Sequence, residues 1–248
     1  MSKINGAIIY RGPSMLDGAP IIVVVTGLAK SSRNEKTGDM LQTWIVRDDV
    51  NPIEAAKTGQ DESICGDCTH RPLLGGSCYV QLVHAPLNIF KSAHRGIYPT
   101  ITGLSDIAAL GVDRVVRLGS YGDPAAVPVG VWEALTAHAS AWTGYTHQWR
   151  NAPHLMSLCM ASADSAAEQG MAKAMGWRTF RVRTASEPVL DKEFVCPASK
   201  EAGVKTDCAS CKACMGTSAK AKASPVIIAH GAKSRRFELT RSPSKVAA

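Results

Sequence analysis

Seven of the eight cysteines fall into two tight groups, and this clustering constrains the fold more than any other feature of the sequence. The first group has the spacing C-x2-C-x9-C, and the second has C-x11-C-x2-C-x2-C. Thiolates at such spacing can surround one metal ion or cluster, so we expect at least one metal centre. Scattered buried thiols are the alternative, which the tight grouping argues against. The two groups are Cys65, Cys68 and Cys78, and Cys196, Cys208, Cys211 and Cys214.

The first group supplies three thiolates, which leaves one coordination position open. The glycine between its first two cysteines lets backbone amides face the sulfurs, and the turn at residues 75–76 brings the third cysteine in. The open position could take His70, His84, Cys159, water or a substrate. An open position suits catalysis, while a fourth protein ligand suits a structural site.

The second group is a complete four-thiolate site. A C-x2-C-x2-C run with a remote Cys-Pro is the ferredoxin type of ligand set in reversed order, typical of a 4Fe–4S cluster. Zinc ribbons more often pair two C-x2-C knuckles, but zinc also accepts four thiolates. The spacing therefore favours iron–sulfur over zinc without excluding zinc. The eighth cysteine, Cys159, lies in an apolar strand and is expected to be a small core residue, with a ligand or reactive role as the alternative.

The composition indicates a soluble protein with a sizeable core. The chain has 248 residues, of which 45% are hydrophobic, and its longest apolar run, Ile21–Val25, is strand-sized. A membrane-spanning helix needs about 18 or more consecutive apolar residues. The first six residues lack the apolar segment and cleavage site of a signal peptide. We therefore expect a cytoplasmic protein, in a bacterial host cell if it is phage-encoded, where reduced cysteines serve as ligands rather than disulfides.

The net charge of +7 is concentrated at the C-terminus. Residues 219–248 hold seven lysines and arginines against one glutamate, so the preceding part is close to neutral. Such a basic tail can contact nucleic acid or another polyanion. The alternative is a solvated, partly disordered terminus.

Hydrophobic periodicity predicts an α/β fold. Residues 19–26 and 42–47 are β-branched strands of an N-terminal hairpin. From about residue 88, strands alternate with helices, which indicates βα units and a parallel sheet. Among these elements are a strand at 156–161 and a helix that Asp164 or Ser165 can cap and that Gly176 ends. We expect a partial or distorted βα barrel, TIM barrel-like, with a flat doubly wound sheet as the alternative. The predicted regions are a hairpin region at 1–50, a βα core with the first cysteine motif at 51–190, a cysteine-rich metal-binding segment with the last strand at 191–232, and a basic tail at 233–248.

Polar residues follow three of the predicted strands. Function in parallel βα sheets sits at the carboxyl ends of strands, so these residues should converge around one mouth. The first cysteine motif precedes the alternating region and could be the loop after the first strand. The polar residues are Arg117, Tyr121 and Asp123, then Tyr145, Thr146 and His147, then Ser186 and Glu187.

Two of these residues are candidates for catalysis. Asp123 could orient a substrate amine or hydroxyl, and His147 could transfer protons. The alternative for Asp123 is a Gly-Asp-Pro turn in which the carboxylate bonds to its own backbone. The alternative for His147 is a surface histidine on a loop.

Several short motifs, taken in order, resemble the phage gene product eighty-eight family, proteins of bacteriophages and mobile elements. The likeness covers roughly residues 36–216 and implies a phage protein. Its motifs are Lys36-Thr37-Gly38, Cys65 to Cys68 followed by Cys78-Tyr79, Val116-Arg117 leading to Gly122-Asp123-Pro124, Trp142 to His147, and the late cysteine set.

The chain is more distantly similar to radical S-adenosylmethionine enzymes. Those are partial βα barrels with a three-cysteine cluster loop and a Gly-Gly-Glu-Pro-like stretch after the second strand. The similarity implies that Tyr79, Gly122 and Asp123 contact a cofactor, with S-adenosylmethionine as the candidate. The departure is the cysteine spacing, which is C-x3-C-x2-C in that family. That difference puts cleavage of the cofactor in doubt.

Two functions follow from these observations. The first is a metal-dependent enzyme that acts on a nucleotide or nucleic acid, with the first cysteine group reactive, Arg117, Tyr121, Asp123 and His147 around it, and the second group auxiliary or structural. The second is a non-catalytic module with structural zinc, whose basic tail contacts nucleic acid. The absence of a recognisable acid–base or nucleophile triad limits the first, and the neutral body limits the second.

Overall fold

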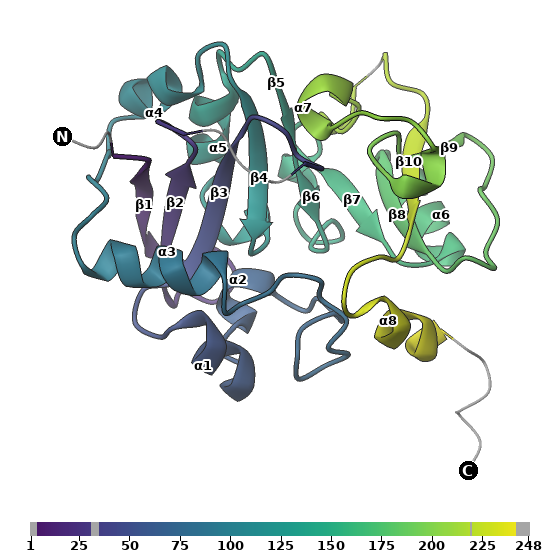
Figure 1. Ribbon diagram of the computed structural model, residues 1–248, viewed down its shortest axis with the longest axis horizontal. Helices are drawn as coiled ribbons and strands as arrows, with labels where there is room; N and C mark the ends of the chain where they lie inside the picture. Colours follow the sequence, from purple (N-terminus) through teal and green to yellow (C-terminus); the bar gives the residue numbers. More distant parts are fainter. Residues whose placement is uncertain (1–3, 31–34, 219, 242–248) are drawn as a thin grey trace.

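The structure is a computed structural model that describes residues 4–30, 35–218 and 220–241. It is a mixed α/β fold with two five-stranded sheets (Figure 1). The first sheet contains, in spatial order, β1 (Gly6–Pro13), β2 (Pro20–Thr26), β3 (Met40–Arg47), β4 (Val115–Tyr121) and β5 (Ala141–Thr143). The second contains β6 (Tyr145–Thr146), β7 (Met160–Ala163), β8 (Thr179–Arg183), β10 (Ser224–Ile228) and β9 (Glu193–Val195).

A single glycine joins the two sheets. Strand β5 pairs in parallel with β4, and after Gly144 the chain continues as β6, which pairs in parallel with β7. A Cβ atom at this glycine would lie 2.8 Å from both Cys159 Sγ and the Leu158 carbonyl oxygen, so only glycine lets the two segments approach so closely. The chain therefore passes from β5 of the first sheet directly into β6 of the second without reversing its direction.

The N-terminal strands are antiparallel, and the strands after them are parallel. Strand β2 pairs antiparallel with both β1 and β3, while the pairs β3–β4 and β4–β5 and all pairs of the second sheet are parallel. The described strands do not close into a barrel, since β1 and β5 are the edges of the first sheet and β6 and β9 those of the second. The mixed α/β class is as expected, while a partial or distorted barrel stays a prediction.

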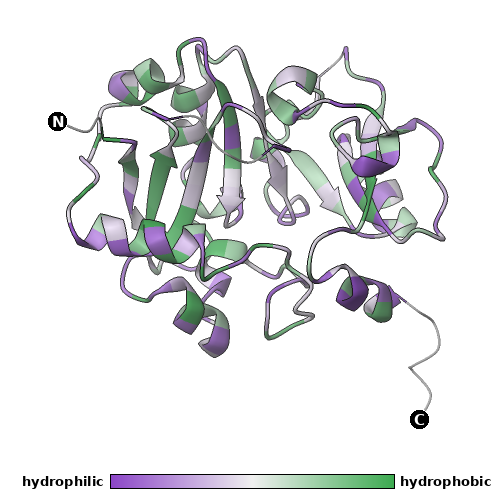
Figure 2. Cartoon of the chain, viewed as in Figure 1, coloured by the Kyte–Doolittle hydropathy of each residue, from purple (hydrophilic) through white to green (hydrophobic). Residues whose placement is uncertain are grey.

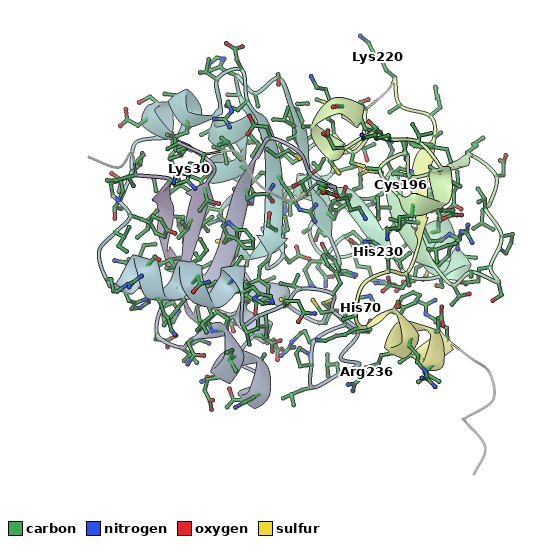
Figure 3. All side chains as sticks on the ribbon, viewed as in Figure 1. Lys30, His70, Cys196, Lys220, His230 and Arg236 are labelled. Atoms are coloured by element: carbon green, nitrogen blue, oxygen red, sulfur yellow. The ribbon has the colours of Figure 1, made fainter. Side chains whose placement is uncertain are left out.

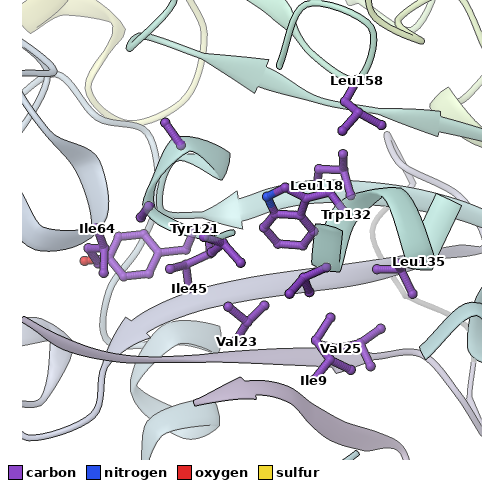
Figure 4. Packing of buried hydrophobic residues seen from close by; sticks show 14 of the residues in the cluster. Ile9, Val23, Val25, Ile45, Ile64, Leu118, Tyr121, Trp132, Leu135 and Leu158 are labelled. Atoms are coloured by element: carbon purple, nitrogen blue, oxygen red, sulfur yellow. The ribbon is translucent and has the colours of Figure 1, made fainter. Parts of the chain in front are cut away.

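The apolar run Ile21–Val25 forms the centre of β2 and is fully buried. β-Branched side chains suit a strand that is covered on both faces. Figure 2 shows this apolar character on β2 and β3. Across the core, Trp132 of α5 (Val129–Thr136) lies beside Leu118 of β4, as Figure 4 shows, and its indole N–H donates to the Pro124 carbonyl oxygen at 2.9 Å.

The helices cover the sheets at several places. Helix α6 (Ala166–Ala174) begins where the sequence predicts, because the Ser165 side chain accepts from the Glu168 N–H, and the left-handed Gly176 follows its end. The remaining helices are α1 (Pro52–Thr58), α2 (Glu62–Cys65), α3 (Ala85–His94), α4 (Leu104–Gly111), α7 (Cys208–Cys211) and α8 (Ser234–Arg241), with short 3-10 turns η1 (Pro124–Ala126), η2 (Pro153–Leu155) and η3 (Lys200–Ala202). No helix within the described ranges is long and apolar enough to cross a membrane.

The C-terminal basic segment is part of the fold as far as residue 241. Phe237 of α8 is 4% exposed, and its ring lies 5.8 Å from the ring of His70. This packing differs from the solvated terminus that the charge pattern suggested, because one aromatic residue anchors the otherwise polar helix. Residues 242–248 of the predicted tail lie outside the described residues.

Candidate functional site

A cavity of about 480 Å³ lies on one face of the two sheets. Its walls contain alternate residues of several strands, as expected where every second side chain points to the same face. These residues are Gln42 and Trp44 of β3, Phe180 and Val182 of β8, and Pro225 and Ile227 of β10. Strand β4 contributes Arg117 and the consecutive residues Gly119, Ser120 and Tyr121, where its register against β3 shifts.

Both cysteine groups line this cavity, at opposite ends of the strands. The first group lies at the carboxyl edge, where the Asp123 N–H, just after β4, donates to the Ile64 carbonyl oxygen beside Cys65. The second lies at the amino edge, where the Cys208 N–H donates to the Lys36 carbonyl oxygen before β3. Figure 1 accordingly shows α2 near the arrowheads of β3 and β4 and α7 near the starts of β4 and β5, and Figure 3 shows Cys196 and His70 far apart in the same view.

The loop of the first cysteine group is held by buried polar contacts. Helix α2 ends at Cys65, and the left-handed Gly66 then turns the chain (φ 59°). The Arg71 guanidinium donates to the Gly66 carbonyl oxygen at 2.9 Å and forms a buried ion pair with Asp61. The Gln148 amide donates to the Cys65 carbonyl oxygen at 3.1 Å. These contacts fix the direction of the first cysteines before any ligand binds.

Burial and mutual proximity raise the pKa values of the first-group thiols. Burial is the larger cause for Cys65, whose pKa is well above its ordinary value, and the neighbouring Cys68 and Cys78 raise it further. Burial also raises the pKa of Cys78, although the Val80 N–H bonds to its sulfur. Such thiols become thiolates when a cation offsets their charge, which is the condition for binding a metal.

The second cysteine group is held by one arginine and by the adjacent strand. The Arg178 guanidinium donates to three backbone carbonyl oxygens around the last cysteine, those of residues 213, 216 and 223. The Cys196 N–H donates to the Val226 carbonyl oxygen of β10 at 2.8 Å. Burial raises the pKa of Cys214 to about 12, and the other three cysteines of the group add to that shift. Four thiols are thus gathered within electrostatic reach of one another.

Two cationic side chains line the cavity within electrostatic reach of the second cysteine group. Arg117 donates to the Tyr79 hydroxyl, next to Cys78 of the first group, at 2.8 Å, and its guanidinium lies 6.0 Å from the centre of the Tyr145 ring. The Nζ of Lys36 lies 2.7 Å from Nε2 of His230, and burial lowers the pKa of Lys36. This part of the cavity therefore offers positive charge and aromatic surface to an occupant.

A cluster of two histidines and one aspartate lies next to the first cysteine group. Nε2 of His70 is 2.7 Å and Nε2 of His147 is 3.7 Å from the same carboxylate oxygen of Asp164. Burial would lower the pKa of His147, but the charges of Cys68 and Asp164 outweigh burial and raise that pKa well above its ordinary value. Burial would raise the pKa of Asp164, but the two histidines hold it well below its usual range.

The residues predicted to be catalytic, cofactor-binding or metal-ligating line the cavity, but the Asp123 carboxylate is taken up by hydrogen bonds from the surrounding turns. The Asp123 carboxylate accepts from the N–H groups of Ala125 and His147 and from the Thr146 hydroxyl, so it has the turn role that the sequence left open. Burial nevertheless raises the pKa of Asp123. Gly122 is left-handed (φ 82°), and a Cβ atom there would lie 2.6 Å from Ile45 Cβ. The remaining predicted residues in the lining are Tyr79, Arg117, Tyr121 and His147 with the seven clustered cysteines.

Some candidates lie elsewhere. Cys159 is fully buried in the apolar core and is not among the residues that line the cavity, so it is not a fourth ligand of the first group in this structure. Glu187 is likewise not part of the lining and instead caps a turn by accepting from the Thr184 N–H. His84 lines the cavity, as does His70.

Sequence reasoning missed Asp164 and Arg178. Asp164 was expected to be a possible helix cap, but Ser165 is the cap and Asp164 directly follows β7. The rule that polar residues after parallel strands converge would have found it, had β7 been placed at Met160–Ala163 rather than earlier. Nothing local indicates the role of Arg178, because its three carbonyl partners lie 35 to 45 residues away.

Comparisons with protein-family models, curated proteins and solved structures give no match to this chain. The resemblances to the phage family and to radical S-adenosylmethionine enzymes therefore rest on their short motifs and remain predictions.

Proposed function

We propose that this protein is a redox metalloenzyme with two cysteine-ligated iron–sulfur centres that share one substrate cavity. The observation that carries the proposal is the position of the two cysteine groups, since both line the same cavity from opposite ends. A purely structural metal site would gain nothing from facing a cavity. Two centres that both face it can exchange electrons with whatever the cavity holds.

The ligand pattern of the second group favours iron–sulfur over zinc, because a C-x2-C-x2-C run with a remote Cys-Pro is the ferredoxin type of ligand set. Backbone N–H groups of Val80 and Ala198 bond to the sulfurs of Cys78 and Cys196, and such hydrogen bonds tune the potentials of iron–sulfur clusters. The positive side chain of Arg117 lies within electrostatic reach of Cys208 and Cys214 and would offset the negative charge of a four-thiolate centre.

The two centres have different roles in the proposal. The first group has three thiolates, so a cluster there keeps one iron open to the cavity, where it can bind and activate a small molecule. The second group has four thiolates and is closed to direct ligation, which suits electron transfer. The resemblance to radical S-adenosylmethionine enzymes makes S-adenosylmethionine the candidate ligand of the open position.

The residues of the chain itself bind and orient the occupant. A volume of about 480 Å³ is within the range of small-molecule sites, which spans about 300–1,000 Å³. The Arg117 guanidinium and the Tyr79 hydroxyl, 2.8 Å apart, can bind an anionic or polar group such as a carboxylate or phosphate. The stacked rings of Tyr79 and His230, with centroids 6.2 Å apart, border the same region. A nucleotide has both an anionic phosphate for the first region and a planar base for the stacked rings.

Anaerobic purification followed by iron, sulfide and zinc analysis tests this proposal. We expect a brown protein with absorbance near about 400 nm and acid-labile sulfide. Cys211→Ser should remove the iron of the second site, while Cys159→Ala, a matched change in the core, should leave the iron content unchanged. A colourless protein with stoichiometric zinc and no sulfide would contradict the proposal and favour the zinc module.

The zinc-stabilised nucleic-acid module is the weaker candidate. It needs a free basic tail, whereas α8 packs on the cavity rim through Phe237. Deleting residues 242–248 tests whether the end of the tail binds nucleic acid. The deletion removes one lysine, so the slope of log binding constant against log salt concentration should fall by about the value of one phosphate contact.

A further inference from the structure

The cluster of His70, His147 and Asp164 has the composition of a metal site whose ligands are not cysteines, although Cys68 hydrogen-bonds to His147. One ligand atom of each side chain lies within 4.8 Å of the other two. Both Nε2 atoms approach the same oxygen, Asp164 Oδ2, at 2.7 Å and 3.7 Å. Two imidazoles and one carboxylate on one side of an ion leave its other positions open.

One ring of this cluster is oriented by a contact behind it. The Ser77 hydroxyl bonds to Nδ1 of His70, which leaves Nε2 directed at the cluster. Metal-ligating histidines are commonly held through their other ring nitrogen in this way. The other two residues are positioned through their backbones, because the His147 N–H donates to Asp123 and the Asp164 N–H donates to Glu168, each at 2.8 Å.

The position of the cluster also fits a site for chemistry. His147 follows β6 and Asp164 follows β7, neighbouring parallel strands whose carboxyl ends lie at the same edge. His70 comes from the loop of the first cysteine group, only two residues after Cys68. All three line the cavity, and the two histidines are partly exposed to it, with side chains 17% and 30% accessible.

We propose that His70, His147 and Asp164 bind a divalent transition-metal ion, such as Mn²⁺, Fe²⁺ or Zn²⁺, at the carboxyl edge of the sheets. Its open positions face the cavity, where they can coordinate an oxygen atom of the substrate. The site does not require the cysteine groups to be loaded, so it can be tested independently of the iron–sulfur proposal.

Mn²⁺ is the probe for this site, because it prefers nitrogen and oxygen ligands and avoids the thiolates of the cysteine groups. Electron paramagnetic resonance of the full-length protein, titrated with Mn²⁺, should show saturable binding of one ion. Asp164→Asn and His70→Ala should each weaken binding by at least about 100-fold, and Ser77→Ala by about tenfold through the loss of the contact behind His70. His94→Ala, which removes a histidine beside Asp48 elsewhere on the protein, should leave the affinity unchanged.

Two controls separate the possible causes of a failure. Asp164→Asn keeps a hydrogen-bond acceptor for His70 and should fold, which its thermal melt without metal checks. Added Mn²⁺ should raise the melting temperature of the wild-type protein but not that of this variant. Absorbance near about 400 nm on the same samples reports the cysteine centres separately. Absence of saturable Mn²⁺ binding to the folded wild-type protein, or equal binding to folded Asp164→Asn, would overturn the proposal and leave a hydrogen-bonded His–Asp–His network.

Discussion

At the scale of single residues, the structure separates groups that face the cavity from groups that hold the cavity in shape. The side chains of Arg117 and His147 line the cavity, whereas the Asp123 carboxylate accepts hydrogen bonds from three donors of the surrounding turns. A buried carboxylate with several donors fixes the positions of the residues that donate to it. Asp123 therefore places His147 rather than acting on a substrate itself.

Asp123→Ala tests that role. The change leaves the N–H groups of Ala125 and His147 and the Thr146 hydroxyl without their acceptor in a buried region. Each unsatisfied donor costs about 1–3 kcal/mol, so the free energy of unfolding should fall by at least about 2–3 kcal/mol. Urea denaturation measures the change, with Asp106→Ala on an exposed helix turn as the control. An unchanged midpoint would contradict the positioning role.

Residue roles were only partly predictable from the sequence. The clustered cysteines and the polar residues after β4 and β6 could be selected because spacing and the topology of parallel strands bring them together. Asp164 was misassigned because its strand was placed too early, and Arg178 could not be found because its partners are distant in the chain. Local patterns do not show which carbonyl groups a buried arginine will meet.

At the scale of elements, β9 connects the second sheet to the second cysteine group. It ends at Val195, directly before Cys196, and it carries Glu193. Both oxygens of Glu193 bond to the Arg181 guanidinium of β8 at 2.8 Å, and the two side chains are 0% and 1% exposed. This buried pair ties the strand, and with it the first ligand of the group, to the sheet.

The same pair gives a prediction about pH. Burial would raise the pKa of Glu193, but the bonds and charge of Arg181 outweigh burial and lower it. A depressed pKa in the folded state contributes stability above the unfolded value of about 4.3, and this contribution is lost as the pH falls through the lower folded pKa. Glu193→Gln should therefore lower the free energy of unfolding by about 3–5 kcal/mol at pH 7. Below about pH 4.3, the free energy of unfolding should decline less steeply with falling pH in this variant than in the wild type. Urea melts at several pH values measure both effects, and parallel declines for the two proteins would contradict the assignment.

Helix α8 gives a second test at this scale. Its Phe237 is buried against His70, whereas Leu239 on the same helix is 59% exposed. Removing a buried phenylalanine side chain costs about 3 kcal/mol or more, so Phe237→Ala should speed amide hydrogen exchange in α8 by about 100-fold. Leu239→Ala should leave the exchange nearly unchanged. Equal exchange in the two variants would mean that the helix is not anchored through Phe237.

The elements themselves were more predictable than their arrangement. Apart from β7, strand and helix positions from residue 104 to residue 183 follow from hydrophobic periodicity, and Ser165 and Gly176 mark the ends of α6. The open sheets could not be deduced, because Gly144 divides what reads as one short strand between two sheets. The packing of α8 depends on a single phenylalanine within a basic segment, which the charge pattern conceals.

At the scale of the whole molecule, the two sheets place two cysteine groups at the ends of one cavity, which cationic and aromatic side chains also line. The sequence indicated that the first group would join the polar strand ends. It could not indicate that the second group would face the same space from the amino edge, since that depends on contacts such as the one between Cys208 and Lys36, 172 residues apart. The proposed function rests on this shared cavity.

The most direct measurement of that claim is anomalous X-ray scattering at the iron edge from crystals grown without oxygen. We predict two iron peaks, one bounded by Cys65, Cys68 and Cys78 and the other by Cys196, Cys208, Cys211 and Cys214, with the cavity between them. A third metal peak at His70, His147 and Asp164 would belong to the separate site. Peaks at the zinc edge alone, or no metal at the first cysteine group, would contradict the account.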